Sequence, residues 1–288
     1  MTVEAVEALL AAQRYVADRP VAMAVHLAMH LGKPLLLEGQ TGIGKTELAK
    51  VLAAALGTEL IRLQCYEGLD ASMALYEWNF PKQVLRIRLE EHSGKSPSEK
   101  ESLIFSQPFL LERPLLRALT RPQAPVLLID EVDRSDEEFE ALLLEFLSDF
   151  QLTIPELGTI QAQQRPIVIL TSNRTRELGE ALRRRCLYLW MDYPSLEQEL
   201  AIVRARVPQV EEKLAFAAVR LVQRLREMQL EKAPGVAETL EWLQGLMLLG
   251  AGELTPQLVQ ETLGLLVKSR EDLLRLRGAA VESLLEGI

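Results

Sequence analysis

The sequence predicts an α/β fold, in which helices cover both faces of a parallel sheet, followed by an α-helical domain. Two observations lead to this prediction. Up to about residue 190, five short apolar runs alternate with helical spacing of apolar residues, which is typical of buried parallel strands. After Pro194 the pattern shows only amphipathic helices, punctuated by proline and glycine. We therefore predict an α/β domain at 1–193 and a helical domain at 194–288.

The five predicted strands are the runs PLLLEG at 34–39, ELIRLQC at 59–65, VLLID at 126–130, IVILTSN at 167–173 and CLYLW at 186–190. The segment 66–107 is irregular, apart from a helix expected near 82–91 and a polar loop expected at 92–102. Trp78 and Phe80 in this segment could contact a substrate. Packing against the domain is favoured, because large apolar residues are more often buried.

Composition excludes several classes of protein. The net charge is −9, with 41 acidic and 32 basic side chains, which argues against a phosphate-backbone binder. Two cysteines, Cys65 and Cys186, are too few for a disulfide scaffold, so a reducing cytoplasm is expected. The first residues lack the basic region and cleavage site of a signal peptide. No apolar run approaches the ~18 residues that a membrane-spanning helix needs.

The strongest motif is a phosphate-binding pattern, G-x-x-x-x-G-K-[ST], between a predicted strand and a predicted helix. Its members are Gly39, Gln40, Thr41, Gly42, Ile43, Gly44, Lys45 and Thr46. The glycines allow backbone N–H groups to turn toward phosphate oxygens, and the helix adds its positive end. We expect Lys45 to pair with the β- and γ-phosphates of ATP and the Thr46 hydroxyl to bind Mg²⁺. A small-molecule kinase would use the same loop and is an alternative.

Two acidic residues directly follow the apolar part of another strand. Asp130 can hold Mg²⁺, and the adjacent Glu131 can polarise the water that attacks the γ-phosphate. The competing interpretation is a solvated acidic helix start, because acids favour helix N-termini. We expect that interpretation to hold for the acids at 133–138 only, since surface acids rarely follow four apolar strand residues.

Two further polar positions are candidates for the same site. Asn173 closes a central strand, where its amide could contact the γ-phosphate or the attacking water, although asparagine also suits a turn. The run Arg183-Arg184-Arg185 precedes the last predicted strand. These arginines could stabilise a helix C-terminus, or one could reach the γ-phosphate bound by a neighbouring subunit.

In this order, the motifs resemble those of AAA+ ATPases, a group of P-loop NTPases. The resemblance rests on the loop at 39–46, on LLIDEVDR at 127–134, on Asn173 as the first sensor and on ALRRRC at 181–186. It implies that residues 195–288 form the lid. It also implies that Lys45, Glu131 and Asn173 are catalytic, as is an arginine finger that falls best on Arg185, with Arg184 as second choice.

Three longer segments resemble the MoxR branch, most closely its CO-dehydrogenase accessory subgroup: LLLEGQTGIGKTELAK, YEGLDASMALYEW and the hairpin-like LTIPELGTIQAQQRP. The resemblance implies an adenine contact at Tyr15 to Ala17. Many family members also carry a nucleotide-sensing arginine in the lid. The comparable turn here, 232–237, has none, so either Lys232 or another residue substitutes or lid closure is weaker.

The resemblance implies Mg²⁺-dependent ATP hydrolysis in a homo-oligomer, with a hexameric ring expected. The energy would remodel a protein client, a metalloenzyme in this subgroup, with a partner that contains a von Willebrand factor A domain. The insert at 66–80 and the hairpin-like segment at 152–165 are the expected contact surfaces. A motor that acts on nucleic acid is the rival. The acidic balance and the lack of basic stretches interleaved with aromatics argue against it.

Overall fold

The structure, a computed structural model, describes residues 1–90 and 96–287. The chain forms two compact units. The first contains Met1–Val6, Pro20–Glu38 and Ala49–Leu189, and the second contains Glu7–Arg19, Gly39–Leu48 and Trp190–Ile288. The domain boundary near residue 193 stays a prediction.

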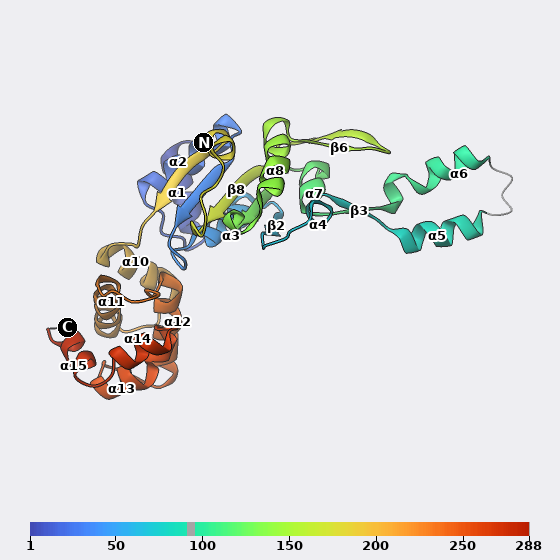
Figure 1. Ribbon diagram of the computed structural model, residues 1–288. Coiled ribbons are helices and arrows are strands. Elements are labelled where there is room, and N and C mark those ends of the chain that lie inside the picture. The colour runs from blue at the N-terminus through green and yellow to red at the C-terminus, as the bar shows by residue number, and fades with distance from the viewer. Residues whose placement is uncertain (91–95, 288) are drawn as a thin grey trace. The chain divides into compact units, whose positions relative to one another are not determined.

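A five-stranded sheet lies at the centre of the first unit (Figure 1). Its strands are β1 (Leu35–Gly39), β2 (Leu60–Gln64), β5 (Val126–Asp130), β8 (Ile167–Ser172) and β9 (Leu187–Met191), in the order β2-β5-β8-β1-β9. The pairs β2/β5, β5/β8 and β8/β1 are parallel. All five strands match the predicted apolar runs to within one residue at either end, which confirms the α/β fold.

Helices pack against this sheet because their apolar faces join its core. The helices and 3-10 turns up to residue 189 are α1 (Val3–Ala12), α2 (Arg19–Leu31), α3 (Lys45–Leu56), α4 (Ala71–Ala74), α5 (Phe80–Leu89), α6 (Pro97–Ile104), η1 (Gln107–Phe109), α7 (Pro114–Thr120), η2 (Val132–Arg134), α8 (Glu137–Asp149) and α9 (Glu180–Arg185). Leu127 and Ile129 of β5, Leu116 of α7 and Phe146 of α8 are almost fully buried in one cluster. Burial of such side chains contributes about 1.5–3 kcal/mol each.

Between β2 and β5 the chain forms an arm that the sequence predicts only in part. The strands β3 (Tyr76–Trp78) and β4 (Leu110–Glu112) pair antiparallel, and α5 and α6 lie beyond them, away from the large sheet (Figure 1). The helix predicted near 82–91 is α5. The polar loop predicted at 92–102 is partly wrong, because α6 begins within it, and its first part (92–95) lies outside the described residues.

Helix α6 forms because its N-terminus is capped. Ser96 and Glu99 form a reciprocal capping box, and Pro97 occupies the first helical position, where its missing N–H is not needed. The two aromatics of the insert behave differently. Trp78 is 8% exposed and packs edge-on against Phe105, as predicted, whereas the prediction of packing is wrong for Phe80, which is 60% exposed at the start of α5.

The strands β6 (Gln151–Ile154) and β7 (Gly158–Gln161) pair antiparallel. They form a hairpin before β8, as the sequence predicts for 152–165. Leu152 and Ile154 of β6 face the core of the first unit, whereas β7 is largely exposed.

After residue 190 the chain is helical. Its elements are α10 (Leu196–Arg206), α11 (Glu212–Glu227), α12 (Val236–Leu248), α13 (Pro256–Thr262), η3 (Leu263–Leu265), α14 (Arg270–Arg275) and α15 (Ala279–Leu285). They enclose a separate apolar core around Trp242, which is fully buried and donates to the Thr262 hydroxyl at 2.9 Å. We call these helices the lid. Among the described residues, no helix has the length and apolar character needed to cross a bilayer.

Candidate nucleotide site

The phosphate loop belongs to the second unit and leaves the end of β1. Gly39, Gly42 and Gly44 have φ of 151°, 80° and 98°, a region that side chains other than glycine rarely adopt. At Gly39 there is also no room, because a Cβ would lie 2.1 Å from the carbonyl oxygen of Met191. The glycines of the motif are therefore required by the shape of the loop.

Lys45 begins helix α3 and folds back into the loop. Its Nζ donates to the carbonyl oxygens of Gly39 and Gln40, at 2.6 Å each, and the residue is 6% exposed. Next to it, Thr46 is partly exposed. A buried ammonium held by main-chain oxygens can exchange these for phosphate oxygens, which are stronger partners.

Tyr15 lies beside this loop. A Cβ on Gly44 would be 3.8 Å from its hydroxyl oxygen, and the ring is 9% exposed. Burial, followed by the charge of Asp18, raises the pKa of the Tyr15 phenol, so it stays neutral at physiological pH. Glu47 of α3 forms an ion pair with Arg206 of α10. The adenine contact at Tyr15 to Ala17 stays a prediction.

In the first unit, Asp130 occupies the carboxyl end of β5 and is 2% exposed. Its two carboxylate oxygens have different donors. Arg62 Nη2 lies 2.6 Å from Oδ2, and the Thr171 hydroxyl donates to Oδ1, also at 2.6 Å. A buried carboxylate needs such partners, and they fix its orientation at the sheet edge.

Glu131 follows in a strained left-handed conformation, with φ 54° and ψ 50°. For a residue with a side chain this costs roughly 1–2 kcal/mol. Its N–H donates to the Thr171 hydroxyl at 2.9 Å, and Gln64 Nε2 donates to its Oε2 at 3.1 Å. Non-glycine residues in this region often mark functional sites. Here the left-handed conformation follows directly after the last residue of β5, and the Glu131 side chain is about one-third exposed.

Asn173 lies close to Glu131. Asn173 Nδ2 lies 3.5 Å from Glu131 Oε1, at the long limit of a hydrogen bond. The main chain beyond β8 is held by Asp133, whose Oδ2 accepts from the N–H groups of Asn173 and Thr175 at 3.2 and 2.8 Å. The strand order places β5 and β8 next to each other, so their carboxyl ends meet at one edge.

Asp133 corrects one expectation. The acids at 133–138 were expected to be solvated, and Asp136, Glu137 and Glu138 are exposed, with Asp136 capping α8. Asp133 is instead 2% exposed and anchors the segment that carries Asn173. The sequence does not show this role, because an acidic residue before a helix has the same local pattern whether its side chain faces water or a neighbouring loop.

The three arginines lie in the last turn of α9 and are exposed. Arg183 stacks on the Tyr188 ring at 5.6 Å, and Arg184 pairs with Glu180 at 2.5 Å. Arg185 donates to the Ser148 hydroxyl at 2.8 Å and to the carbonyl oxygen of Ala181 at 3.2 Å. The bond to Ala181 lies within α9 and agrees with the first interpretation, in which these arginines stabilise the helix C-terminus. Because Arg185 is exposed, its side chain is also accessible to another subunit.

Thr171, Gln64 and Arg62 complete the acidic edge and are missed by the sequence reasoning. Thr171 is 1% exposed and links Asp130 to Glu131 through one hydroxyl. A signal for it exists, because Thr171 is a polar residue near the end of an otherwise apolar central strand, where parallel sheets carry function. Gln64 and Arg62 lie on β2 and show no comparable signal.

Cys65 lies buried behind this edge. Burial, followed by the charges of Asp130 and Asp133, raises the pKa of its thiol to about 12. Burial likewise raises the pKa of Cys186 to about 12. Both thiols are therefore protonated at neutral pH and are poor nucleophiles.

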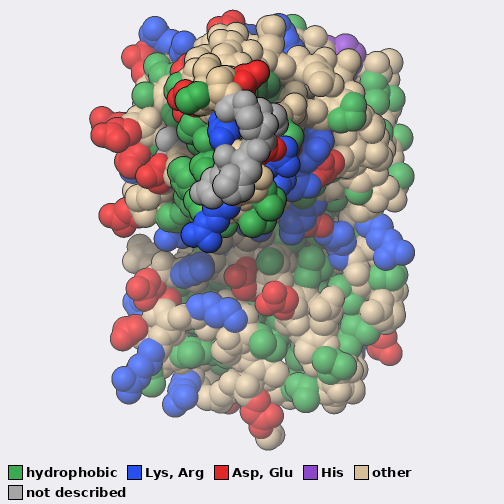
Figure 2. Space-filling view, turned by 90° about the vertical axis from the view of Figure 1, so that its right-hand side faces the viewer, with side chains coloured by type: hydrophobic (Ala, Val, Ile, Leu, Met, Phe, Trp, Pro, Cys, Tyr) green, Lys and Arg blue, Asp and Glu red, His purple; other side chains and the backbone are tan. Residues whose placement is uncertain are grey.

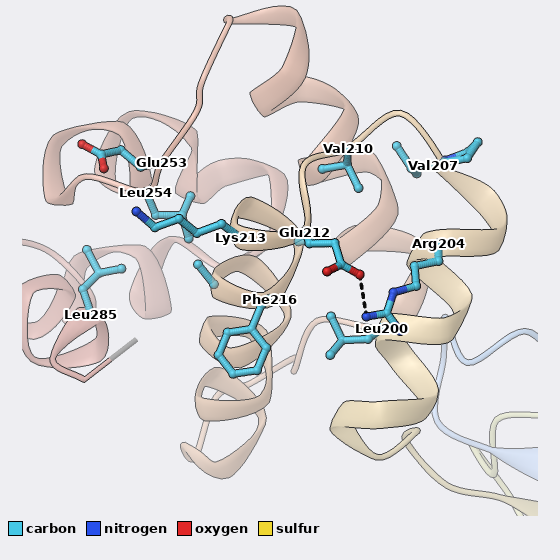
Figure 3. A pocket seen from close by; sticks show the side chains of 13 residues that line it. Leu200, Arg204, Val207, Val210, Glu212, Lys213, Phe216, Glu253, Leu254 and Leu285 are labelled. Carbon is cyan, nitrogen blue, oxygen red and sulfur yellow. Dashed lines mark hydrogen bonds and ion pairs between the residues drawn. The ribbon is translucent and has the colours of Figure 1, made fainter.

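A separate pocket of about 700 Å³ lies in the lid (Figure 3). Its walls are mostly apolar, and the ion pair of Arg204 with Glu212 (2.9 Å) crosses one side. The lining residues are Leu200, Arg204, Val207, Pro208, Val210, Glu212, Lys213, Ala215, Phe216, Ala217, Glu253, Leu254 and Leu285. It shares no residue with the phosphate loop or the acidic edge.

Comparison with solved structures supports the fold. A RuvB variant of Thermotoga maritima aligns with a TM-score of 0.51 over 91% of this chain and 70% of its own, at 19% identity. Among curated proteins, an uncharacterized protein of Staphylococcus haemolyticus is 30% identical over 171 residues. The gas vesicle ATPase GvpN1 of Halobacterium salinarum is 25% identical over 208 residues. These matches cover 57% and 69% of this chain.

The chain spans little more than half the length of these two relatives, 57% and 58%. The chaperone protein ClpB 2 of Parasynechococcus marenigrum is 32% identical over 48% of this chain and 13% of its own length. The model of the AAA domain, dynein-related subfamily, matches residues 34–186, more than half of the 288 residues. This match runs from β1 to the end of α9 and includes both the phosphate loop and the acidic residues at the end of β5. The chain therefore belongs to the AAA domain family, in its dynein-related subfamily.

Proposed function

We propose that this chain binds ATP with Mg²⁺ and hydrolyses it to ADP and phosphate. The observation that carries the proposal is the acidic edge, where a buried Asp130, a strained Glu131 and Asn173 converge. Membership of a family of P-loop ATPases and the glycine conformations of residues 39–46 support it.

Binding would rest on residues 39–46. Phosphate oxygens would replace the Gly39 and Gln40 carbonyls at the Lys45 ammonium. The donor set fits Mg²⁺, because the Thr46 hydroxyl and the Asp130 carboxylate are the hard oxygen ligands that this ion prefers. When bound, Mg²⁺ would neutralise charge on the phosphates.

Hydrolysis would rest on Glu131 as general base. Its carboxylate is about one-third exposed, so a water molecule can reach it. Gln64 and Asn173 contact different oxygens of this carboxylate, which limits its rotation. We propose that Asn173 contacts the attacking water or the γ-phosphate, and its 3.5 Å separation from Glu131 supports this role.

We further propose that the chain acts as a homo-oligomer, a hexameric ring by resemblance, in which Arg185 contacts the nucleotide of a neighbouring subunit. Arg185 is exposed at the end of α9, and Arg184 is the second choice. A closed ring suits a site that a neighbour completes.

Mixed oligomers test the arginine finger. Arg185→Ala and Glu131→Gln should each hydrolyse ATP poorly. Mixing the two variants should restore part of the turnover, because some interfaces then pair an intact base with an intact arginine. Phosphate release is measured on oligomers shown to be mixed by differently tagged subunits. No recovery would favour the helix-capping role of 183–185, or a shift of the role to Arg184.

We propose that hydrolysis drives remodelling of a protein client, and that a partner protein with a von Willebrand factor A domain binds the arm. Helix α5 exposes large apolar side chains: Phe80 (60%), Val84 (51%), Leu85 (59%), Ile87 (43%) and Leu89 (70%). Figure 2 faces this end of the first unit and shows hydrophobic and basic side chains together. Lys82 and Arg88 supply exposed basic groups, whereas Arg86 pairs with Glu90. Exposed apolar surface rimmed by charge is typical of protein interaction sites, and these cations favour an acidic partner surface.

Partner stimulation tests the arm. A protein with a von Willebrand factor A domain, expressed together with this chain, should co-purify with it and raise its ATPase activity. Replacing both Leu85 and Leu89 by Glu should weaken this binding on the order of tenfold or more, as for buried interface anchors. Leu248→Glu is the control, because this leucine is 89% exposed at the end of α12. Stimulation by DNA with no response to a protein partner would favour the nucleic-acid motor instead.

The client is proposed to be a metalloenzyme that needs its active site completed, with the cytoplasm as the expected location. This rests on the resemblance to the CO-dehydrogenase accessory subgroup. Deletion of the gene should leave the target enzyme folded but with an incomplete metal centre, as metal content and activity per mole would show. Full metallation of every candidate enzyme in the deletion strain would contradict the maturation role, but not the ATPase role.

A further inference from the structure

The turn that opens helix α12 lies directly against the phosphate loop, within the second unit. The N–H groups of Val236 and Ala237 donate to the carbonyl oxygen of Gly42 at 2.9 and 3.2 Å. A Cβ on Gly235 would lie 2.8 Å from the Cα of Gly42 and 2.9 Å from the carbonyl oxygen of Thr41. Gly235 has φ −83° and ψ −177°, which any residue can adopt. This glycine is therefore required by the close approach of the two backbones.

A buried ion pair supports the turn from behind. Arg226, at the end of α11, makes two hydrogen bonds to Glu199 of α10, at 2.6 and 2.8 Å, and the two side chains are 5% and 0% exposed. The third guanidinium nitrogen, Nε, donates to the carbonyl oxygen of Pro234 at 2.8 Å. Only a planar guanidinium can hold a carboxylate with two nitrogens and a main-chain oxygen with the third.

The same carboxylate also binds the first turn of α12. The Thr239 hydroxyl donates to Glu199 at 2.8 Å and lies 3.1 Å from the carbonyl oxygen of Gly235. The Tyr193 ring covers the guanidinium, with its centroid 4.6 Å from the guanidinium carbon. Three lid helices and the 234–237 turn are thus fixed around one charged pair.

The contact constrains the phosphate loop because a peptide group is planar and trans. The carbonyl of Gly42 and the N–H of Ile43 belong to one such group and point in opposite directions. When two N–H groups of α12 hold the Gly42 oxygen, the Ile43 N–H must point away from α12. A loop that binds phosphate through its N–H groups depends on such orientations being set before the ligand arrives.

We propose that Arg226 is a positioning residue for nucleotide binding, which holds the 234–237 turn on the phosphate loop by pairing with Glu199. The lid is then coupled to the loop through main-chain hydrogen bonds. Arg226 does not itself face the loop, because its three guanidinium nitrogens are bonded to Glu199 and Pro234, so it acts through the turn. The inference rests on the proposed function, in which residues 39–46 bind ATP.

Arg226→Lys tests the proposal in the full-length chain. Lysine keeps the charge beside Glu199 but cannot also donate to the Pro234 carbonyl in the arginine geometry. We expect ATP affinity to fall on the order of tenfold, as for one lost hydrogen bond from a charged donor, with a smaller change in kcat than in KM. Hydrogen exchange should also show that the amides of Val236 and Ala237 lose protection.

Gly235→Ala is the second variant, because it displaces the turn and leaves the ion pair in place. It should lower ATP affinity in the same way as Arg226→Lys. Thr262→Val is the control for a general weakening of the lid, since it removes the buried hydrogen bond from Trp242 without touching the turn. It should lower the melting temperature yet keep ATP affinity and the protection of the two amides.

The outcomes separate this inference from the proposed function. If Lys45→Ala loses ATP binding while Arg226→Lys and Gly235→Ala bind as the unchanged chain does, only the positioning role is contradicted. Equal losses of affinity in Thr262→Val and Arg226→Lys would also contradict it, since the effect would then be lid stability alone. If the unchanged chain binds no ATP, the proposed function and this inference both fail.

Discussion

Changing Glu131 to Gln is expected to leave ATP bound but almost unhydrolysed. Glutamine keeps the size of the side chain and can still contact Gln64 and Asn173, so the acidic edge should stay intact. It cannot take a proton from water, and loss of a general base lowers the rate on the order of 10²-fold or more. That corresponds to about 2.7 kcal/mol in the activation barrier.

The two quantities are measured separately, ATP affinity by calorimetry and turnover by phosphate release. Glu138→Gln is the matched control, because Glu138 is an exposed acid at the start of α8 and faces no part of the site. It should hydrolyse ATP normally. Normal ATP turnover in Glu131→Gln would contradict the assignment of Glu131 as the general base, whatever its affinity for ATP.

Changing Lys45 to Ala is expected to abolish tight ATP binding. The side chain is buried in the loop, and its ammonium is held by the Gly39 and Gln40 carbonyls. Without the ammonium, the negative charge of the β- and γ-phosphates has no cation to pair with inside the loop. A buried charge without a partner carries a large desolvation cost, so binding should be weak.

Calorimetric titration with ATP checks this expectation. Lys50→Ala is the control, since it removes one positive charge from the exposed side of the same helix. It should bind ATP nearly as the unchanged chain does. Similar affinities for Lys45→Ala and Lys50→Ala would contradict the role of the loop.

Strands β1, β5 and β8 could be predicted because a parallel strand buried on both faces is a nearly uninterrupted apolar run. Strands β2 and β9 are only partly buried, and they were predictable because most of their residues are nevertheless apolar. The arm could be predicted only in part. The helix expected near 82–91 is α5, but strands β3 and β4 have three residues each, too short for a visible period. Helix α6 carries a local signal, the Ser96–Glu99 capping box, in a stretch whose composition resembles a loop.

The sequence likewise predicts some residues of the candidate site and not others. The residues at 39–46 and Asp130–Glu131 stand at the ends of predicted strands, where a spacing rule identifies them. Asp133 and Thr171 act through hydrogen bonds to Asn173 and Asp130, and in each bond the two residues are about 40 positions apart in the sequence. No local pattern predicts such a pairing. The role of Arg226 is also not predicted by the sequence, where it is one of the basic residues in the last turn of an amphipathic helix.

The central claim is that this chain hydrolyses ATP with Mg²⁺ at the phosphate loop and the acidic edge. The most direct measurement is phosphate release from ATP by the purified full-length chain, with Mg²⁺ and with the metal removed by a chelator. We predict release that requires the metal, that is lost in Lys45→Ala, and that falls on the order of 10²-fold in Glu131→Gln. Release that persists in Lys45→Ala, or none from any oligomeric form of the unchanged chain with Mg²⁺, would contradict the claim.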